Sequence, residues 1–140
     1  MSQPCFPDDE ADYPTMPIGI LVVDDQFAVR EGLARLLTCS ATPLRYVSTA
    51  ANAAEALLAA AKLLPNVVVL DADLDGEDGL ALIPQLALTA GVLVLTSHGD
   101  AGTRARAAGL GALAFIEKHQ PAAALLEAIE RVGHRRPLGG

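Results

Sequence analysis

Acidic, hydroxyl and lysine side chains follow four short apolar runs of this sequence, at the points where the runs end. They are Asp24, Asp25, Asp71, Thr96 and Lys118. Carboxylates about 4 Å apart repel by roughly 4 kcal/mol at an effective dielectric constant of about 20, so a converging cluster takes up a proton or a cation. An all-oxygen site that also holds a phosphoryl group suits Mg²⁺. These residues therefore predict a Mg²⁺ site where a hydroxyl and a lysine clamp phosphoryl oxygens and a carboxylate accepts the group.

The segments that must position these groups alternate between strand-like and helix-like patterns. Apolar or β-branched runs predict strands at 18–23, 44–47, 67–70, 92–95 and 112–116. Composition and periodicity predict helices at 28–37, 50–64, 79–88, 102–108 and 121–132. Pro65 stops the second helix, Pro84 weakens or kinks the third, and Gly133 caps the last. Five such units predict an α/β fold, with a doubly wound parallel sheet of order 2-1-3-4-5 and helices on both faces.

The length and composition predict one domain with a core of its own. The chain has 140 residues, of which 51% are hydrophobic and 19% charged, too apolar a composition for intrinsic disorder. Residues 1–17 hold four prolines, four acids and little apolar periodicity, so we expect a flexible leader there. The domain is then expected at 18–133, with 134–140 a tail or the start of a linker.

Charge and apolar patterning exclude several classes of protein. The net charge of −7 argues against direct nucleic-acid binding by this chain. No apolar run approaches the roughly 20 residues of a membrane span, and the first residues lack the pattern of a secretory signal. Cys5 and Cys39 have neither metal-site nor redox spacing, which favours a reduced, cytoplasmic protein.

Four sequence stretches, in order and on alternating elements, carry a family resemblance. They are LVVDD (21–25), VVVLD (67–71) with DG (78–79), VLTS (94–97) and GLGALAFIEK (109–118). Together they resemble the receiver domain of bacterial two-component response regulators over about residues 18–133, which implies the flavodoxin-like, receiver-type form of the predicted sheet. VDDQFAVREGL (23–33), and KH (118–119) followed by LLEAI (125–129), are most similar to the branch that precedes a LuxR-type helix-turn-helix domain.

The resemblance implies a role for each acidic residue of the predicted site. Asp71 would be the phosphoacceptor and, with Asp25, a direct ligand of Mg²⁺. The backbone carbonyl of Asp73 would be a third ligand, and Asp24 would act mainly through a metal-bound water. Thr96 would then be the switch hydroxyl.

Lys118 and Phe115 complete the set of residues that the resemblance implies. Lys118 would pair with the phosphoryl group, and Phe115 occupies the place of the family's switch aromatic. Some neighbouring residues depart from the usual pattern, with His119 where proline often follows the lysine, and Leu74-Asp75 where Met-Pro is common. Since no required group is missing, these departures bear on rates and leave the predicted activity in place.

The function implied is a phosphorylation-dependent signalling switch without enzymatic action on other substrates. A histidine kinase or a small phosphodonor would supply the phosphoryl group. Phosphorylation would change the surface made by segments 102–108, 112–116 and 121–132 and control an output, transcription through a further domain being the expected one. The resemblance also allows a homodimer, through that surface or through the first and last helices.

Three other interpretations fit some of the same residues. The run Asp71 to Gly76 matches half of an EF-hand calcium loop, but its twelfth position is Leu82 where that loop needs glutamate. Asp71 and Asp73 also resemble the nucleophile motif of haloacid-dehalogenase-like phosphatases, although there the nucleophile belongs to the first strand. A pseudo-receiver, an interaction module that is not phosphorylated, stays open as the third.

Overall fold

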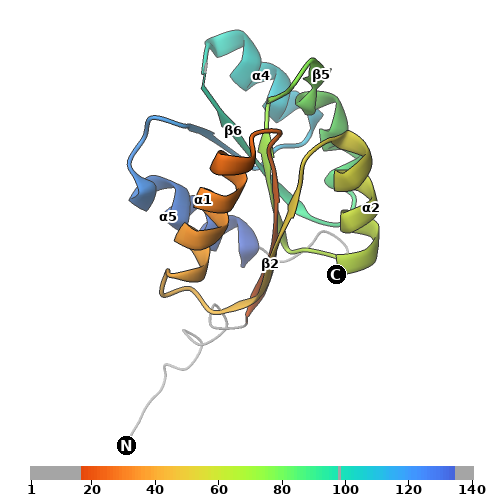
Figure 1. Ribbon diagram of the computed structural model, residues 1–140. Coiled ribbons are helices and arrows are strands. Elements are labelled where there is room, and N and C mark those ends of the chain that lie inside the picture. The colour runs from red at the N-terminus through yellow and green to blue at the C-terminus, as the bar shows by residue number, and fades with distance from the viewer. Residues whose placement is uncertain (1–16, 98, 135–140) are drawn as a thin grey trace, which may run out of the picture.

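Five parallel strands form the central sheet of the protein, in the order that the sequence predicts. The computed structural model describes residues 17–97 and 99–134. The strands are β1 (Ile18–Val23), β2 (Leu44–Ala50), β3 (Val67–Asp71), β6 (Gly91–Thr96) and β7 (Ala114–Glu117). They lie in the order β2-β1-β3-β6-β7, with every neighbouring pair parallel (Figure 1). The first, third and fourth strands in sequence occupy the centre, where polar residues at their ends converge.

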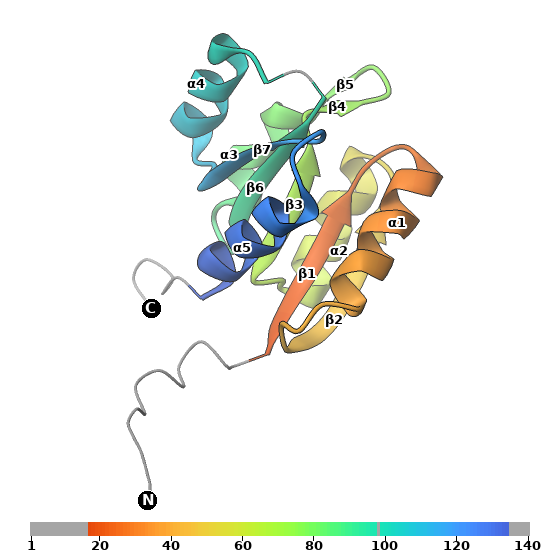
Figure 2. The ribbon, with the colours of Figure 1, turned by 90° about the vertical axis from the view of Figure 1, so that its left-hand side faces the viewer.

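Helices cover both faces of this sheet, as predicted. The helices are α1 (Phe27–Thr38), α2 (Ala53–Leu63), α3 (Ile83–Leu86), α4 (Ala101–Leu110) and α5 (Ala122–Gly133), with a 3₁₀ helix η2 (Gly79–Leu82) before α3. Figure 2 shows α1 and α5 on one side of the strands and α2 on the other. A core on each side of the sheet joins α1 and α5 to one face and α2, α3 and α4 to the other.

The apolar runs form strands because both of their faces are buried. Along β1, Ile20 and Val22 contribute to the core beneath α1 and α5, whereas Leu21 and Val23 contribute to the core beneath α2. All four are at most 1% exposed. Alternate side chains of a strand point to opposite faces, so a sheet covered twice needs apolar residues at every position.

The structure differs most from the prediction at residues 79–88, before β6, where one continuous helix was expected. Residues 79–82 form the 3₁₀ helix η2, and a single turn of α-helix, α3, follows at Ile83–Leu86. Pro84 lies in the first turn of α3 instead of kinking a longer helix, because proline lacks the N–H that a helix interior requires but the first turn does not.

Other element boundaries also need correction. The predicted helix over 50–64 begins later, because β2 extends to Ala50 and the Asn52 side chain caps α2 by accepting from the amide of Glu55. The strand predicted at 112–116 is β7 at Ala114–Glu117. Gly133 was expected to cap the last helix, but it is the final residue of α5.

A two-stranded hairpin that the sequence analysis did not predict follows β3. It pairs β4 (Asp73–Leu74) with β5 (Glu77–Asp78) in antiparallel register. Asp75 and Gly76 form its turn with φ angles of 52° and 89°, and Asp-Gly is a preferred pair for a turn of this hand. The hairpin therefore projects acidic side chains beside the end of β3.

The predicted leader and tail lie almost entirely outside the described residues. Of these segments only Pro17, which is exposed, and His134, which follows α5, are described. No helix within residues 17–97 and 99–134 has the length and apolar character needed to cross a membrane.

Candidate functional site at the carboxyl edge of the sheet

Three polar side chains are buried at the carboxyl edge of the sheet. Asp24 directly follows β1, Asp71 is the last residue of β3, and Thr96 is the last residue of β6. Their exposed fractions are 1%, 6% and 5%. Because β1, β3 and β6 are neighbours, the fold brings together groups that lie up to 72 positions apart in the sequence (96 minus 24).

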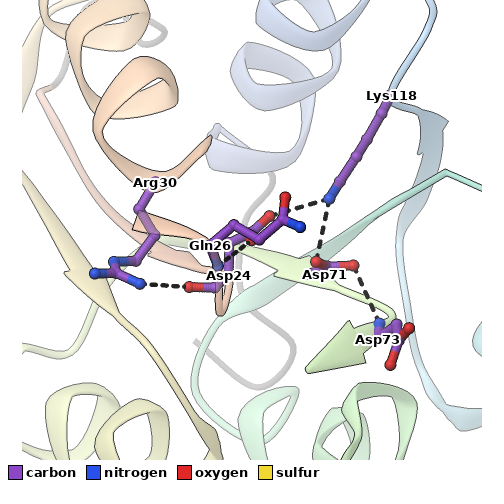
Figure 3. A network of polar contacts seen from close by, with 6 residues as sticks. All are labelled: Asp24, Gln26, Arg30, Asp71, Asp73 and Lys118. Carbon is purple, nitrogen blue, oxygen red and sulfur yellow. Dashed lines mark hydrogen bonds and ion pairs between the residues drawn. The ribbon is translucent and has the colours of Figure 1, made fainter. Parts of the chain in front are cut away.

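Lys118 joins two of these carboxylates. Its Nζ atom lies 3.1 Å from Oδ2 of Asp24 and 3.1 Å from Oδ2 of Asp71, and donates to both (Figure 3). The lysine follows β7, and its backbone amide donates to the carbonyl oxygen of Thr96 at 2.7 Å. This hydrogen bond continues the pairing of β6 with β7 by one residue, and it directs the lysine side chain across the carboxyl edge toward the acids.

A third carboxylate completes an oxygen-rich cluster. Carboxylate oxygens of Asp24, Asp25 and Asp71 lie within 4.8 Å of one another, and Asp25 is the half-buried member that faces solvent. Three ionised carboxylates beside one lysine leave an excess of two negative charges. A hard divalent cation with oxygen ligands, such as Mg²⁺, fits this donor set and this charge.

Burial perturbs the two central charges in characteristic ways. Desolvation raises the pKa of Asp71 to about 6, and the neighbouring Asp24 carboxylate adds to this, while the Asp73 amide and Lys118 oppose it. Burial lowers the pKa of Lys118, but attraction to Asp71 and hydrogen bonds to both carboxylates outweigh burial and hold it above its ordinary value. The lysine therefore stays charged at neutral pH, and the Asp71 carboxylate is held in an unfavourable environment.

Backbone amides and one arginine hold the loops around the acids. Oδ1 of Asp24 accepts from the amide of Gln26 at 2.9 Å, and Oδ1 of Asp71 accepts from the amide of Asp73 at 3.1 Å. Nη1 of Arg30 donates to the backbone carbonyl of Asp24 at 3.0 Å. The role of Arg30 could not be predicted from the sequence, because a cation in the first turn of a helix gives no signal of a contact with the preceding loop.

The other residues singled out from the sequence lie farther from the cluster. Asp73 has an exposed side chain in β4, and its amide is the group seen to contact Asp71. Phe115 is half-buried on β7, with the guanidinium carbon of Arg104 from α4 4.6 Å from the centre of its ring. Phe115 thus lies at the contact between β7 and α4.

Two of the acids in the hairpin are tied to neighbouring helices. The Glu77 side chain accepts from the amide of Ala53 at the start of α2, at 3.0 Å. Asp78 accepts from both terminal nitrogens of Arg106 on α4, and also from the amide of Leu80. These contacts join the loop after Asp71 to the helices on one face of the sheet.

The geometry bears on two of the competing interpretations. Asp71 ends a buried strand of the central sheet, and residues 75 and 76 form a hairpin turn, whereas an EF-hand loop joins two helices. β3 is also the third strand of the sheet in sequence order, whereas the phosphatase nucleophile follows the first strand. The fold therefore supports neither alternative.

Comparison with known families decides the classification. The response regulator receiver domain model matches residues 20–130. The chain belongs to the receiver domain family. Both the predicted fold and the predicted family are thereby confirmed, and receiver domains are modules of phosphorylation-based signal transduction.

Transcriptional regulators are among the relatives of this receiver domain. It is 36% identical over 126 residues to the transcriptional activator protein ExaE of Pseudomonas putida, covering 84% of this chain and 56% of that protein. It is 35% identical over 118 residues to the transcriptional regulatory protein LnrK of Bacillus subtilis (strain 168), covering 82% and 53%. The chain thus spans about half the length of these relatives.

A solved structure of a LuxR-family regulator has the same fold. The crystal structure of a two-component response regulator of the LuxR family from Aurantimonas sp. SI85-9A1 superposes with a TM-score of 0.78 at 30% identity, covering 86% of this receiver domain and 89% of that chain. This agrees with the branch of the family that the sequence resembles.

Proposed function

We propose that this receiver domain is a switch thrown by phosphorylation of Asp71. The observation that carries the proposal is the convergence of Lys118 on Asp24 and Asp71, with Asp25 beside them, at the carboxyl edge of the sheet. An Asp71 oxygen attacks the phosphorus atom of a phosphohistidine or an acyl phosphate. The new O–P bond forms as the bond to the donor's leaving group breaks, and the leaving group takes up a proton or departs as an anion.

Each neighbouring group has a part in this transfer. Asp25, Asp71 and the Asp73 carbonyl would hold Mg²⁺ directly, and Asp24 would act mainly through a metal-bound water. The ion would supply positive charge that offsets the charge of the acids and of the phosphoryl oxygens. Lys118 gives up part of its hydrogen bonding to the two carboxylates and pairs with the incoming phosphoryl oxygens. Its positive charge stabilises the negative charge on these oxygens. No protein base is needed, since the attacking carboxylate is already ionised.

The signal leaves the site through Thr96 and Phe115. A phosphoryl group on Asp71 offers strong acceptors to the nearby hydroxyl, and a charge-assisted hydrogen bond is worth about 1.5–3 kcal/mol. Movement of Thr96 toward it frees space that the Phe115 ring can fill. The surface of α4, β7 and α5 changes as a result and controls an output, transcription through a further domain.

The partners proposed are a histidine kinase as donor and, for the output, a second copy of the chain. Either the α4–β7–α5 surface or the α1 and α5 surface would form the homodimer. The chain itself would not bind nucleic acid, and it would work in the cytoplasm. The relatives named as transcriptional regulators support an output in transcription, and the net charge of −7 supports the absence of nucleic-acid binding by this chain.

Labelling by acetyl phosphate tests the phosphoacceptor. With Mg²⁺ present, intact mass should show one added phosphoryl group that is lost in base, and EDTA should prevent the addition. Asp71→Asn should abolish it. Labelling that persists in Asp71→Asn would move the site elsewhere, and no labelling of the wild-type protein would favour a pseudo-receiver.

Two further variants separate the roles of metal and lysine. Asp25→Asn should weaken Mg²⁺ binding measured by calorimetry, because it removes a carboxylate ligand. Lys118→Ala should leave Mg²⁺ bound and slow phosphoryl transfer, or uncouple transfer from the response of α4. Loss of Mg²⁺ binding in Lys118→Ala would contradict this division.

A further inference from the structure

Arg30 contacts the loop that carries two of the proposed metal ligands. Its Nη1 atom donates to the backbone carbonyl of Asp24 at 3.0 Å, as Figure 3 shows. That carbonyl belongs to the peptide joining Asp24 to Asp25, so its direction sets where the Asp25 side chain starts. The arginine is half-buried, and its side chain makes no hydrogen bond to α1 within the described part of the chain.

The other polar groups of Asp24 are held by the fold itself. Its amide donates to the carbonyl of Ala50 at 3.1 Å, which continues the pairing of β1 with β2. Its two carboxylate oxygens accept from the Gln26 amide and from Lys118. Two long side chains therefore reach Asp24 in the described part of the chain, that of Lys118 at the carboxylate and that of Arg30 at the backbone carbonyl.

The position of Arg30 is otherwise unfavourable. It lies in the first turn of α1, where the partial positive charge of the helix end repels a cation, and that turn contains no acidic residue. Two contacts hold the guanidinium there. One is the Asp24 carbonyl, and the other is the ring of Phe27, whose centre lies 5.5 Å from the guanidinium carbon.

We infer that Arg30 is a positioning residue for the cation site of this domain. By fixing the Asp24–Asp25 peptide it orients Asp25, the most exposed carboxylate of the cluster, whose side chain has no hydrogen bond to another described residue. The inference rests on the proposed function in one respect, that these acids bind Mg²⁺. It assigns to Arg30 no contact with the phosphoryl group.

Positioning and simple electrostatics predict opposite results when the charge is removed. A cation near three carboxylates weakens Mg²⁺ binding through repulsion, so its loss alone would tighten binding. Loss of an outer hydrogen bond that orients a ligand weakens metal binding by about 10-fold or more. Arg30→Met therefore distinguishes the two, because it keeps the apolar stem and removes both the charge and the donor.

Arg35→Met is the matched control. Arg35 is on the same helix and carries the same charge, but it is exposed and its side chain has no hydrogen bond or ion pair to another described residue. NMR titration with Mg²⁺ alone, at fixed ionic strength and without phosphodonor, gives the dissociation constant of each variant. Melting temperatures in EDTA report whether each protein is folded.

If Arg30 positions the site, Arg30→Met should bind Mg²⁺ with a dissociation constant about 10-fold higher than that of the wild type, and Arg35→Met should bind like the wild type. Arg30→Lys, which keeps the charge with a shorter reach, should fall between them, and it decides the matter if Arg30→Met does not fold. Saturating Mg²⁺ should restore the rate of labelling by acetyl phosphate in the Arg30 variants. Binding in Arg30→Met and Arg30→Lys that equals or exceeds the wild type overturns the inference.

The same measurements keep the two proposals apart. Wild-type protein that binds Mg²⁺ but takes no phosphoryl group contradicts the proposed function, while the Arg30 variants still decide the inference from metal binding. Wild-type protein that is labelled, with unchanged Mg²⁺ binding in every Arg30 variant, contradicts the inference and leaves the function standing. Wild-type protein that binds no Mg²⁺ overturns both.

Discussion

At the scale of single residues, the site concentrates charge where the fold excludes water. Asp24 and Asp71 are almost fully buried and share one lysine. The single positive charge of that lysine does not balance the three negative charges of Asp24, Asp25 and Asp71. The raised pKa of Asp71 is the measure of this cost. A bound cation would remove the cost, so stability and metal binding should be coupled through this residue.

Stability in EDTA should depend on pH through Asp71. An aspartate in the unfolded chain ionises near pH 3.8, whereas Asp71 in the folded protein has a pKa of about 6. Between these values the folded protein holds a proton that the unfolded chain has released. The free energy of unfolding should therefore fall as the pH rises from about 4 to about 6, by up to roughly 3 kcal/mol, and stay level above that range.

Urea unfolding of the wild type and of Asp71→Asn measures this effect. The variant cannot ionise at this position, so the stability of the wild type relative to the variant should decline over the same pH range. Addition of Mg²⁺ at pH 7.5 should recover stability in the wild type more than in the variant. A difference in unfolding free energy between the two proteins that does not change with pH would contradict the assignment of the pH dependence to Asp71.

Gly79 lies where β3, the strand that ends at Asp71, approaches η2 too closely for a side chain. A Cβ atom there would meet the backbone carbonyl of Asp71, and would lie 3.0 Å from that of Ala72. Backbone at the end of a central strand cannot yield, so Gly79→Ala should cost about 1–3 kcal/mol of unfolding free energy and slow labelling of Asp71. Gly32→Ala on α1 is the control.

Gly32 has open space around its Cβ position, so its replacement should be neutral or stabilise by up to about 1 kcal/mol. Urea denaturation gives both stabilities, and intact mass gives the rate of labelling. Equal effects of the two substitutions would show that the close approach to Asp71 has no consequence.

At the scale of elements, α4 contacts both the hairpin and β7. Arg106 pairs with Asp78 in β5, and Arg104 lies over the ring of Phe115 in β7. The Thr96 backbone is joined to this region through the amide of Lys118. A change at Asp71 therefore has short routes to α4 from two sides.

Thr96→Ala should separate phosphorylation from the response of these elements. The variant keeps the carboxylates and Lys118, so it should still be labelled on Asp71. It lacks the hydroxyl that would bond to the phosphoryl group, so NMR shifts at α4 and β7 on addition of beryllofluoride, a phosphoryl mimic, should be lost. Normal shifts in Thr96→Ala would mean that the signal takes another route and that Phe115 has no part in it.

At the scale of the whole molecule, one sheet is shared by two cores. Ile129 from α5 lies in the core beneath α1 and α5 and is 1% exposed. Ile129→Ala should cost about 2–5 kcal/mol of unfolding free energy, and unfolding should stay a single transition because both cores need the same strands. Leu88→Ala, at a residue 80% exposed, should change stability by no more than about 0.5 kcal/mol. Two resolved transitions in urea would show that the cores unfold independently.

The sequence alone was sufficient for the strand order and for the edge at which the site would form. Strands buried on both faces require continuous apolar runs, and the polar residue that ends each run marks the carboxyl edge, as at Asp71 and Thr96. The family and its fold followed from these motifs and are confirmed. Boundaries near Pro84 and Asn52 were less certain from the sequence, because a cap or a first-turn proline changes local structure without changing the apolar pattern.

Only the tertiary structure decided which groups touch. That Lys118 reaches both Asp24 and Asp71 depends on the pairing of β6 with β7, and the raised pKa of Asp71 depends on how completely the helices exclude water. The contact of Arg30 with the Asp24 carbonyl likewise depends on how α1 leaves the sheet. Residue types and spacing determine which strands form. The distance between two side chains depends on the packing of elements that are far apart in the chain, and the local sequence pattern does not determine that packing.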